Sequence, residues 1–220
     1  MKKICVLHAP KPYILKCPPQ GLMSIAAYLK GNDIKIDILD ANIHYIDAKS
    51  IKNYSYKKLL TRKSYSNNFD TIKQDFPENE LSDYFLKNHF DIVLLDCHFT
   101  GTVNYSFRTC ELIKRVLPDA TVIVGGIHAS IFHKEILMKY PIDIVIRGEG
   151  EEISLNLIKA LINEVHDLSE IQGISYRIGR EMFVNPGSGI VDDLNTLYPV
   201  YDVYDEFEMN LYRQYVKAVL

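Results

Sequence analysis

Closely spaced cysteines are missing from this sequence of 220 residues. Its four cysteines, Cys5, Cys17, Cys97 and Cys110, lie far apart, and no two of them form a CxxC pair. A structural zinc site is built from closely spaced thiolates, so the spacing does not predict one. In a reducing compartment we expect free thiols, with Cys5 and Cys110 as small core residues.

Concentrated positive charge is also missing. The 25 Lys and Arg residues are scattered among 28 Asp and Glu residues, and the formal net charge is −3. Binding to a phosphate backbone needs clustered Lys and Arg, so nucleic acid is not expected as a partner. With 47% apolar residues, the chain can bury one sizeable core.

Long hydrophobic runs are absent as well. The longest apolar runs have the length of strands, so no membrane span is expected. The start, MKKICVLHAPKPY, is basic, but its apolar stretch is short and is soon broken by prolines, which does not fit a signal peptide. We expect a soluble, cytoplasmic protein with no membrane partner.

Short apolar runs alternate with segments of helical periodicity. The runs are KICVLHA (3–9), IKIDILD (34–40), DIVLLD (91–96), TVIVGG (121–126) and IDIVIRG (142–148). This alternation is typical of βαβ units, and runs that are apolar on both faces fit strands covered by helices on both sides. The sequence therefore predicts an α/β fold: a Rossmann-like (flavodoxin-like), doubly wound, parallel five-stranded sheet in the order 2-1-3-4-5.

Two regions depart from this alternation. Residues 41–90 are polar and rich in Tyr and Lys, and we expect a helical insertion with one helix near PENELSDYFLKN. Residues 174–184, ISYRIGREMFV, predict a small C-terminal β-hairpin. We therefore expect one domain at 1–165, with the insertion at 41–90, and a hairpin with a linker at 166–220. The apolar, helix-like end predicts that a further domain follows.

Polar residues and glycines follow the predicted strands. Open parallel sheets bind ligands beyond the carboxyl ends of their strands, so these positions are the candidate site. They are His8-Ala9-Pro10, Asp40-Ala41-Asn42, Asp96-Cys97-His98, Gly125-Gly126-Ile127-His128 and Arg147-Gly148-Glu149-Gly150-Glu151.

One function that fits part of this pattern is a phosphorelay receiver domain with Asp96 as phosphoacceptor. That chemistry also needs a pair of acids after the first strand, a Ser or Thr after the fourth and a Lys after the fifth. The sequence has His8, Gly125 and Arg147 near those positions. A dinucleotide-binding domain fits less well, because no GxGxxG follows the first strand. The receiver stays as an alternative, beside a degenerate domain that binds no cofactor.

Glycines at two strand ends favour a different ligand. Gly125 and Gly126 end a central strand, where the missing β-carbons let a ligand lie close to the sheet edge. A turn with positive φ would explain one glycine. Two adjacent glycines, with RGEGE at a second strand end, indicate a long ligand tail that crosses the edge. We expect Gly126→Val to prevent ligand uptake while leaving the fold intact.

A set of motifs carries a family resemblance. The motifs are, in order, CPPQGLMSIAAYLK, IKIDILDANI, DIVLLDCHFTG, VIVGGIHAS, IDIVIRGEGEE and IQGISYR. Together they resemble the N-terminal cobalamin (B12)-binding domain of class B radical S-adenosylmethionine (SAM) enzymes. This group includes the anaerobic magnesium-protoporphyrin IX monomethyl ester cyclases and many methyltransferases. The resemblance covers most of residues 1–200.

The resemblance implies how the cofactor binds. Cobalamin would lie over the carboxyl edge of the sheet, and its nucleotide tail would run past the two glycines. The implied cofactor-binding residues are Pro19, Gly21, Leu22, Asp40, His98, Thr100, Gly101, Gly125, Gly126, His128, Gly148, Glu149 and Gly150. For Glu149 the positive end of a helix dipole is an equally good explanation.

Residues 96–101 also match DxHxxG, by which another group of cobalamin proteins supplies a histidine to cobalt. In that group the motif follows the first strand, whereas here it follows the third. The resemblance therefore implies that His98 lines the tail pocket and does not bind cobalt. No protein ligand to a metal and no catalytic residue is predicted.

Radical SAM chemistry also needs a CxxxCxxC loop for a [4Fe–4S] cluster, and the sequence has none. The resemblance implies a cobalamin-binding module of methyltransferase or cyclase type that is not catalytic alone. Its implied partners are cobalamin and a C-terminal radical SAM domain in cis, which would hold the iron-sulfur cluster and SAM.

Overall fold

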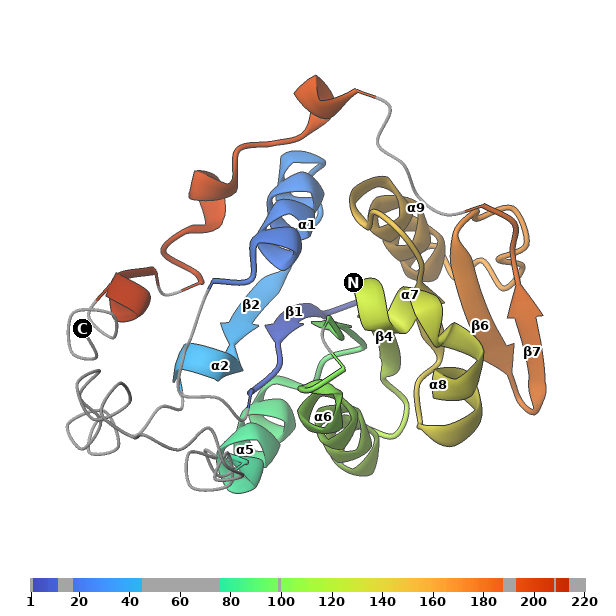
Figure 1. The fold of residues 1–220 in the computed structure, drawn as a ribbon, viewed down its shortest axis with the longest axis horizontal. Helices are drawn as coiled ribbons and strands as arrows, with labels where there is room; N and C mark the ends of the chain where they lie inside the picture. The colour runs from blue at the N-terminus through green and yellow to red at the C-terminus, as the bar shows by residue number, and fades with distance from the viewer. Residues whose placement is uncertain are drawn as a thin grey trace, which may run out of the picture.

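A seven-stranded sheet forms the centre of the computed structural model, which describes residues 2–11, 18–44, 76–98, 100–187, 193–207 and 209–213. The strands are β1 (Ile4–His8), β2 (Asp37–Asp40), β3 (Ile92–Asp96), β4 (Thr121–Gly125), β5 (Ile144–Ile146), β6 (Ile174–Ile178) and β7 (Glu181–Val184). Their order is β2-β1-β3-β4-β5-β6-β7 (Figure 1). Strands β1 to β5 pair in parallel, which confirms the predicted order.

The predicted hairpin is also confirmed, since β6 and β7 pair antiparallel. The hairpin does not stand apart from the parallel strands. Strand β6 pairs antiparallel with β5, with Ile144 opposite Tyr176, so the hairpin extends the five predicted strands into a sheet of seven. The domain boundary at residue 165 stays a prediction.

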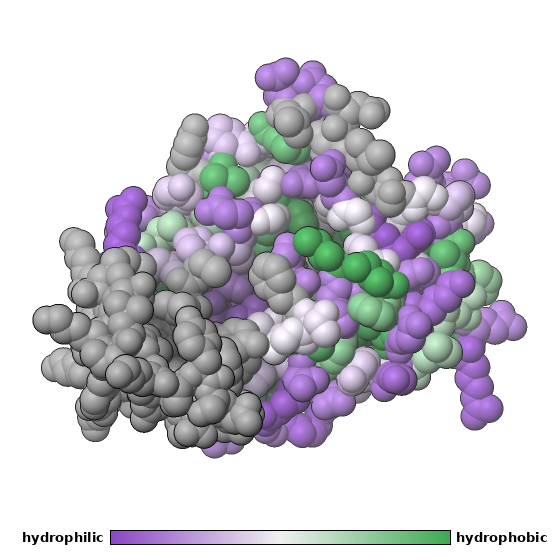
Figure 2. All heavy atoms as spheres, viewed as in Figure 1, coloured by the Kyte–Doolittle hydropathy of each residue, from purple (hydrophilic) through white to green (hydrophobic). Residues whose placement is uncertain are grey.

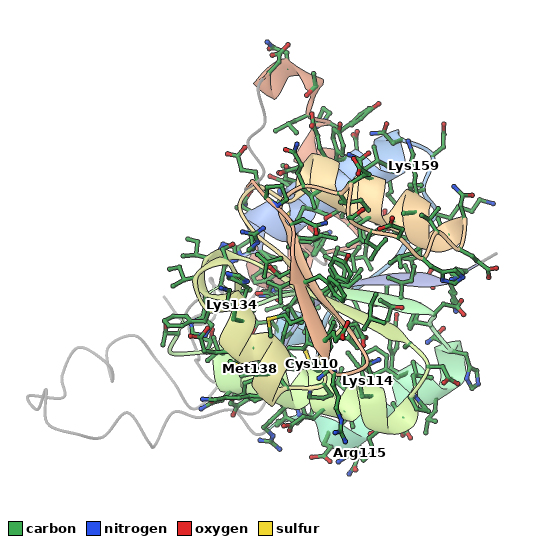
Figure 3. All side chains as sticks on the ribbon, turned by 90° about the vertical axis from the view of Figure 1, so that its right-hand side faces the viewer. Cys110, Lys114, Arg115, Lys134, Met138 and Lys159 are labelled. Carbon is green, nitrogen blue, oxygen red and sulfur yellow. The ribbon has the colours of Figure 1, made fainter. Side chains whose placement is uncertain are left out.

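Helices cover both faces of the sheet. One face carries α1 (Gln20–Gly31) and α9 (Glu151–Ile162). The other carries α5 (Glu78–Asn88), α6 (Val103–Val116), α7 (Ile127–Ile131) and α8 (His133–Lys139). Figure 3 shows the two helical layers on either side of the sheet, with Lys159 on α9 and Lys134 and Met138 on α8.

Alternation along the central strands builds the two cores. In β1, Cys5 and Leu7 pack with the layer of α5 and α6, while Ile4 and Val6 pack with the layer of α1 and α9. In β3, Val93 and Leu95 pack with the first layer and Ile92 and Leu94 with the second, and the strand ends on the buried Asp96. Successive side chains of a strand point to opposite faces, and burying each large one stabilises the fold by about 1.5–3 kcal/mol. This is why both faces of the central runs had to be apolar.

The insertion is described in part. The short helix α2 (Ala41–His44) follows β2, and α5 confirms the helix expected near PENELSDYFLKN. Residues 45–75, on which the rest of the insertion prediction falls, lie outside the described residues. Within the described part of the chain, none of the helices is both long and apolar enough to cross a membrane.

Residues 193–207 and 209–213 are here called the C-terminal segment, which packs against α1 through η3 (Val200–Val203) and reaches Asp40 at the end of β2 through Tyr212. The segment contains two short 3-10 helices, η2 (Leu194–Thr196) and η3, and residues 209–213 form a helical turn. Val203 and Phe207 are fully buried in the core cluster that contains α1. Figure 1 shows the segment in orange to red, on the outer side of α1.

Candidate functional site

A pocket of about 710 Å³ opens at the carboxyl edge of the parallel strands. Its floor comes from the ends of β1, β3, β4 and β5, and its walls include the first turns of α1 and α9. The pocket therefore lies where an open parallel sheet is expected to bind ligands.

Ten of the thirteen residues proposed from the sequence line this pocket: Pro19, Gly21, Leu22, His98, Gly101, Gly125, Gly126, Gly148, Glu149 and Gly150. The other three are absent from the lining. Asp40 is 1% exposed and contacts the lining residue His8, while Thr100 and His128 bond to each other at 3.0 Å. The structure thus brings most of the proposed set together, and their contact with a cofactor stays a prediction.

The two adjacent glycines have different roles. A β-carbon on Gly125 would meet Cβ of Ile146 at 3.7 Å, which is an ordinary contact. Gly126 has φ +116°, and its β-carbon would lie 2.9 Å from the carbonyl oxygen of Cys97. Gly126 is therefore required by the backbone of the turn itself. The expectation that Gly126→Val leaves the fold intact is not supported, because backbone atoms would have to move.

Gly150 is also explained by packing. Its β-carbon would lie 2.6 Å from Cδ1 of Ile25, where α1 approaches the start of α9. Of these three glycines, Gly125 is the one whose missing side chain leaves open space in the pocket without being needed by the apo fold.

His98 lies between the start of α1 and the turn after β4. Its Cε1 is 3.8 Å from the position of a β-carbon on Gly21, and its Nδ1 is 2.7 Å from that position on Gly126. The ring therefore lies between Gly21 and Gly126 in the pocket lining, and its role toward a ligand tail stays a prediction. The structure does not test its relation to cobalt.

A buried polar network forms the β1–β3 side of the pocket. Nδ1 of His8 lies 3.0 Å from Oδ1 of Asp40, and Nζ of Lys11 lies 2.7 Å from Oδ2 of Asp96. The backbone N–H of Lys11 donates to Oδ1 of Asn42 at 3.0 Å. These side chains are largely buried, so their positions are fixed by one another before any ligand arrives.

Asp96 is held in its charged form by this network. Burial alone would raise its pKa, but the charges of Lys11 and His8 and the hydrogen bonds from Lys11 and the Ala9 amide outweigh burial and lower the pKa. Nε2 of His8 lies 3.8 Å from Asp96, which places the ring between two carboxylates. The network thus balances two buried acids with Lys11 and the imidazole.

The sequence analysis placed His8, Asp40, Asn42 and Asp96 among the strand-end positions but did not predict their contacts with one another. Lys11 was not named. A signal was present in the expected strand order, since His8 and Asp40 end adjacent parallel strands and are register partners. Two polar residues at the same level of neighbouring strand ends predict a contact.

The receiver alternative finds no support in this geometry. Oδ1 of Asp96 accepts the Ala9 amide at 3.0 Å, Oδ2 is paired with Lys11, and the residue is 8% exposed. Among the described residues, no group of three or more His, Cys, Asp or Glu could hold a metal ion. Burial also raises the pKa of Cys97 to about 12, so this thiol is not a thiolate at neutral pH.

An apolar surface borders the pocket. Ile127 and Ile131, on the helix that begins directly after Gly126, are 60% and 64% exposed. Figure 2 shows hydrophobic residues gathered at the place of α7 on this face. Exposed apolar patches are found at protein–protein interfaces, membrane-binding surfaces and ligand-binding grooves.

Comparisons with known proteins find similar curated chains. The chain is 28% identical over 147 residues to the anaerobic magnesium-protoporphyrin IX monomethyl ester cyclase of Rubrivivax gelatinosus, covering 65% of this chain and 26% of the cyclase. It is 26% identical over 111 residues to the cobalamin-dependent radical SAM methyltransferase TokK of Streptomyces tokunonensis, covering 50% of this chain and 16% of TokK. The chain thus spans about a quarter or less of the length of these relatives.

Solved structures share the fold. The cobalamin-dependent radical enzyme OxsB, solved with aqua-cobalamin and SAM, superposes on 95% of this chain and 25% of its own, with TM-score 0.65 and 19% identity. The methyltransferase TsrM of Kitasatospora setae, solved with cobalamin and a [4Fe-4S] cluster, covers 90% of this chain and 31% of its own, with TM-score 0.63 and 19% identity. The B12 binding domain model matches residues 14–158, more than half of the sequence, and the chain therefore belongs to the B12 binding domain family.

Proposed function

We propose that the pocket holds the nucleotide tail of cobalamin while the corrin ring lies over the carboxyl edge of the sheet. The observation that carries this proposal is Gly125, whose missing side chain leaves room in the pocket that the apo fold does not require. Membership of the B12 binding domain family supports the same ligand.

The pocket residues suit such a tail. Leu22, Ile25 and Ile146 offer apolar surface against which a flat base can pack. The pocket also touches the first turns of α1 and α9, where unpaired amides and the helix dipole favour a phosphate group. The residues present therefore fit the group.

Cobalamin, when bound, supplies methyl-carrier or one-electron chemistry. The chain's own part is to bind and orient the cofactor. The polar network of His8, Lys11, Asn42 and Asp96 would hold one side of it, and the Gly125 strand end would admit the tail on the other side. The described residues suggest no group for a reaction of the chain's own.

We propose further that the chain works as the cobalamin-binding part of a radical SAM enzyme of methyltransferase or cyclase type. The similar curated proteins are several times longer than the matched segment. A radical SAM domain in cis would supply the iron-sulfur cluster and SAM, and the exposed Ile127 and Ile131 lie where such a domain would cover the edge. We place this protein in the cytoplasm.

The direct test is reconstitution. The protein is incubated with excess hydroxocobalamin, passed through gel filtration and scanned for the visible absorbance of the corrin. We expect bound cobalamin in near-equal molar amount to protein, and its loss from a Gly125→Val variant that elutes as the folded protein. If the unmodified protein elutes without corrin absorbance, the proposal is wrong and a degenerate domain is the better description.

A further inference from the structure

A tyrosine from the far end of the described chain reaches the polar network of the pocket. Tyr212 is 3% exposed, and its hydroxyl donates a hydrogen bond to Oδ2 of Asp40 at 2.8 Å. The same hydroxyl lies 3.5 Å from Nδ1 of His8. Tyr212 is 172 residues away from Asp40 and 204 residues away from His8 in the sequence, so its hydroxyl joins distant parts of the chain.

Asp40 is the point at which Tyr212 meets the pocket. Oδ1 of Asp40 accepts a hydrogen bond from the backbone N–H of Asn42 at 3.1 Å and lies 3.0 Å from Nδ1 of His8. Oδ2 accepts the hydrogen bond from the Tyr212 hydroxyl. His8 and Asn42 both line the pocket. A buried carboxylate that loses one of its donors becomes costly, so the partners of Asp40 hold one another in place.

The network continues to the Lys11 side chain, a cation in the pocket lining. The Asn42 side chain accepts from the Lys11 amide at 3.0 Å, and Nζ of Lys11 pairs with Asp96 at 2.7 Å. Each residue on this path from Asp40 is within hydrogen-bond distance of the next. Tyr212 therefore supports, through Asp40, the side chains that form the polar side of the pocket.

The rest of the C-terminal segment is anchored apart from the pocket. Val203 and Phe207 are fully buried in the core cluster that contains α1, and the ring of Tyr198 packs at 2.5 Å from the position of a β-carbon on Gly31. None of these three residues lines the pocket. Tyr212 is thus a residue of this segment whose side chain contacts the network directly.

We propose that Tyr212 is a positioning residue that couples ligand binding in the pocket to docking of the C-terminal segment. The inference rests on the proposed function, in which cobalamin is the ligand. A ligand that needs His8 and Asn42 in their observed positions binds more tightly when Tyr212 is docked. Because such coupling is reciprocal, bound ligand must hold the segment in place by the same factor.

The experiment compares the unmodified protein with Tyr212→Phe and with Tyr198→Phe as the matched control. Both variants lose one hydroxyl from the same segment, but Tyr198 packs on Gly31 and Tyr28 and lies outside the network. Hydroxocobalamin affinity is measured by equilibrium dialysis. Hydrogen–deuterium exchange of residues 193–207 is followed by mass spectrometry with and without hydroxocobalamin.

We expect Tyr212→Phe to weaken hydroxocobalamin binding about tenfold, the size of effect given by removing one hydrogen bond to a buried charged group. In the unmodified protein, hydroxocobalamin should slow exchange in residues 193–207. This slowing should be lost in Tyr212→Phe and kept in Tyr198→Phe. If Tyr212 only stabilised the segment, Tyr212→Phe would speed exchange in the ligand-free protein, but hydroxocobalamin would still slow that exchange.

Three results would overturn the coupling. One is unchanged affinity in a folded Tyr212→Phe variant, and another is ligand-independent exchange of the segment in the unmodified protein, which needs no variant to fold. The third is a failure of the unmodified protein to bind hydroxocobalamin. That result contradicts the proposed function itself and removes the coupling with it, whereas normal binding without coupling contradicts this inference alone.

Discussion

Substitutions at the two adjacent glycines should have different effects. A change at Gly125 should weaken ligand binding, whereas a change at Gly126 should lower folding stability. At Gly125 a β-carbon meets nothing nearer than Cβ of Ile146 at 3.7 Å and its carbonyl oxygen at 3.9 Å. Gly125→Ala should therefore keep the native stability, or raise it by about 0.4–1 kcal/mol by restricting the unfolded chain. Gly125→Val should also fold, since valine is favoured in strands, but its branched side chain would enter the pocket.

At Gly126 the same change should act on the fold. An L-residue at φ +116° is strained, and the added carbon would lie 2.9 Å from a backbone oxygen. We expect Gly126→Ala to lower stability by about 1–3 kcal/mol. For a chain of 220 residues that corresponds to a fall in melting temperature of roughly 2–12 °C.

The assay pairs thermal unfolding, followed by circular dichroism, with hydroxocobalamin titration followed by visible absorbance. Gly125→Val should unfold at the native temperature and bind at least about tenfold more weakly, which corresponds to about 1.4 kcal/mol. Native binding by a folded Gly125→Val would refute the idea that a tail crosses this strand end. An unchanged melting temperature in Gly126→Ala would refute the account of the turn.

Four further predictions concern single side chains. Lys11→Met leaves the buried Asp96 carboxylate without its cation and should lower the free energy of unfolding by about 3–5 kcal/mol in urea titrations. Because the folded pKa of Asp96 is lowered, its stabilising contribution should be present above about pH 4 and vanish as the pH falls through the folded pKa. Asp96→Asn should remove that pH dependence, and equal acid sensitivity in both proteins would contradict this. Ser154→Ala should keep or raise the melting temperature, because the buried Ser154 hydroxyl has no hydrogen-bond partner within the described residues. The Co(II) EPR spectrum of reconstituted protein should lack nitrogen superhyperfine splitting, and a splitting that disappears in His98→Ala would show that His98 binds cobalt.

The parallel sheet could be predicted because its signal is local. Val93, Leu94 and Leu95 are apolar in succession, and a strand that needs apolar residues on both faces must lie between two helical layers. The strand ends followed from the same pattern, while the full set of thirteen residues, ten of which line the pocket, came from the family resemblance. What the pattern lacked was the pairing of the hairpin with β5, which depends on tertiary contacts rather than on local periodicity.

The polar network was harder to predict because its contacts depend on register and on long sequence separation. His8 and Asp40 are 32 residues apart and meet because β1 and β2 are neighbours in register. Tyr212 arrives from the region that the sequence analysis described only as a linker. At Gly150, packing stands beside the ligand as an explanation, because a β-carbon there would meet Cδ1 of Ile25. In each case the deciding atom belongs to another element.

The two sides of the pocket differ in what a ligand must change on binding. On the β1–β3 side, Asp96 is already paired with Lys11 and lies 3.8 Å from Nε2 of His8, so the polar groups that meet the ligand need little rearrangement. On the β4 side, Gly125 offers space without a side chain to order. Binding costs less conformational entropy where the site is already arranged. If this division holds, Lys11→Met should weaken binding through the loss of order in the network, while Gly125→Val should weaken it through shape alone. Raised exchange of the β1 and β3 amides in Lys11→Met, but not in Gly125→Val, would distinguish the two causes.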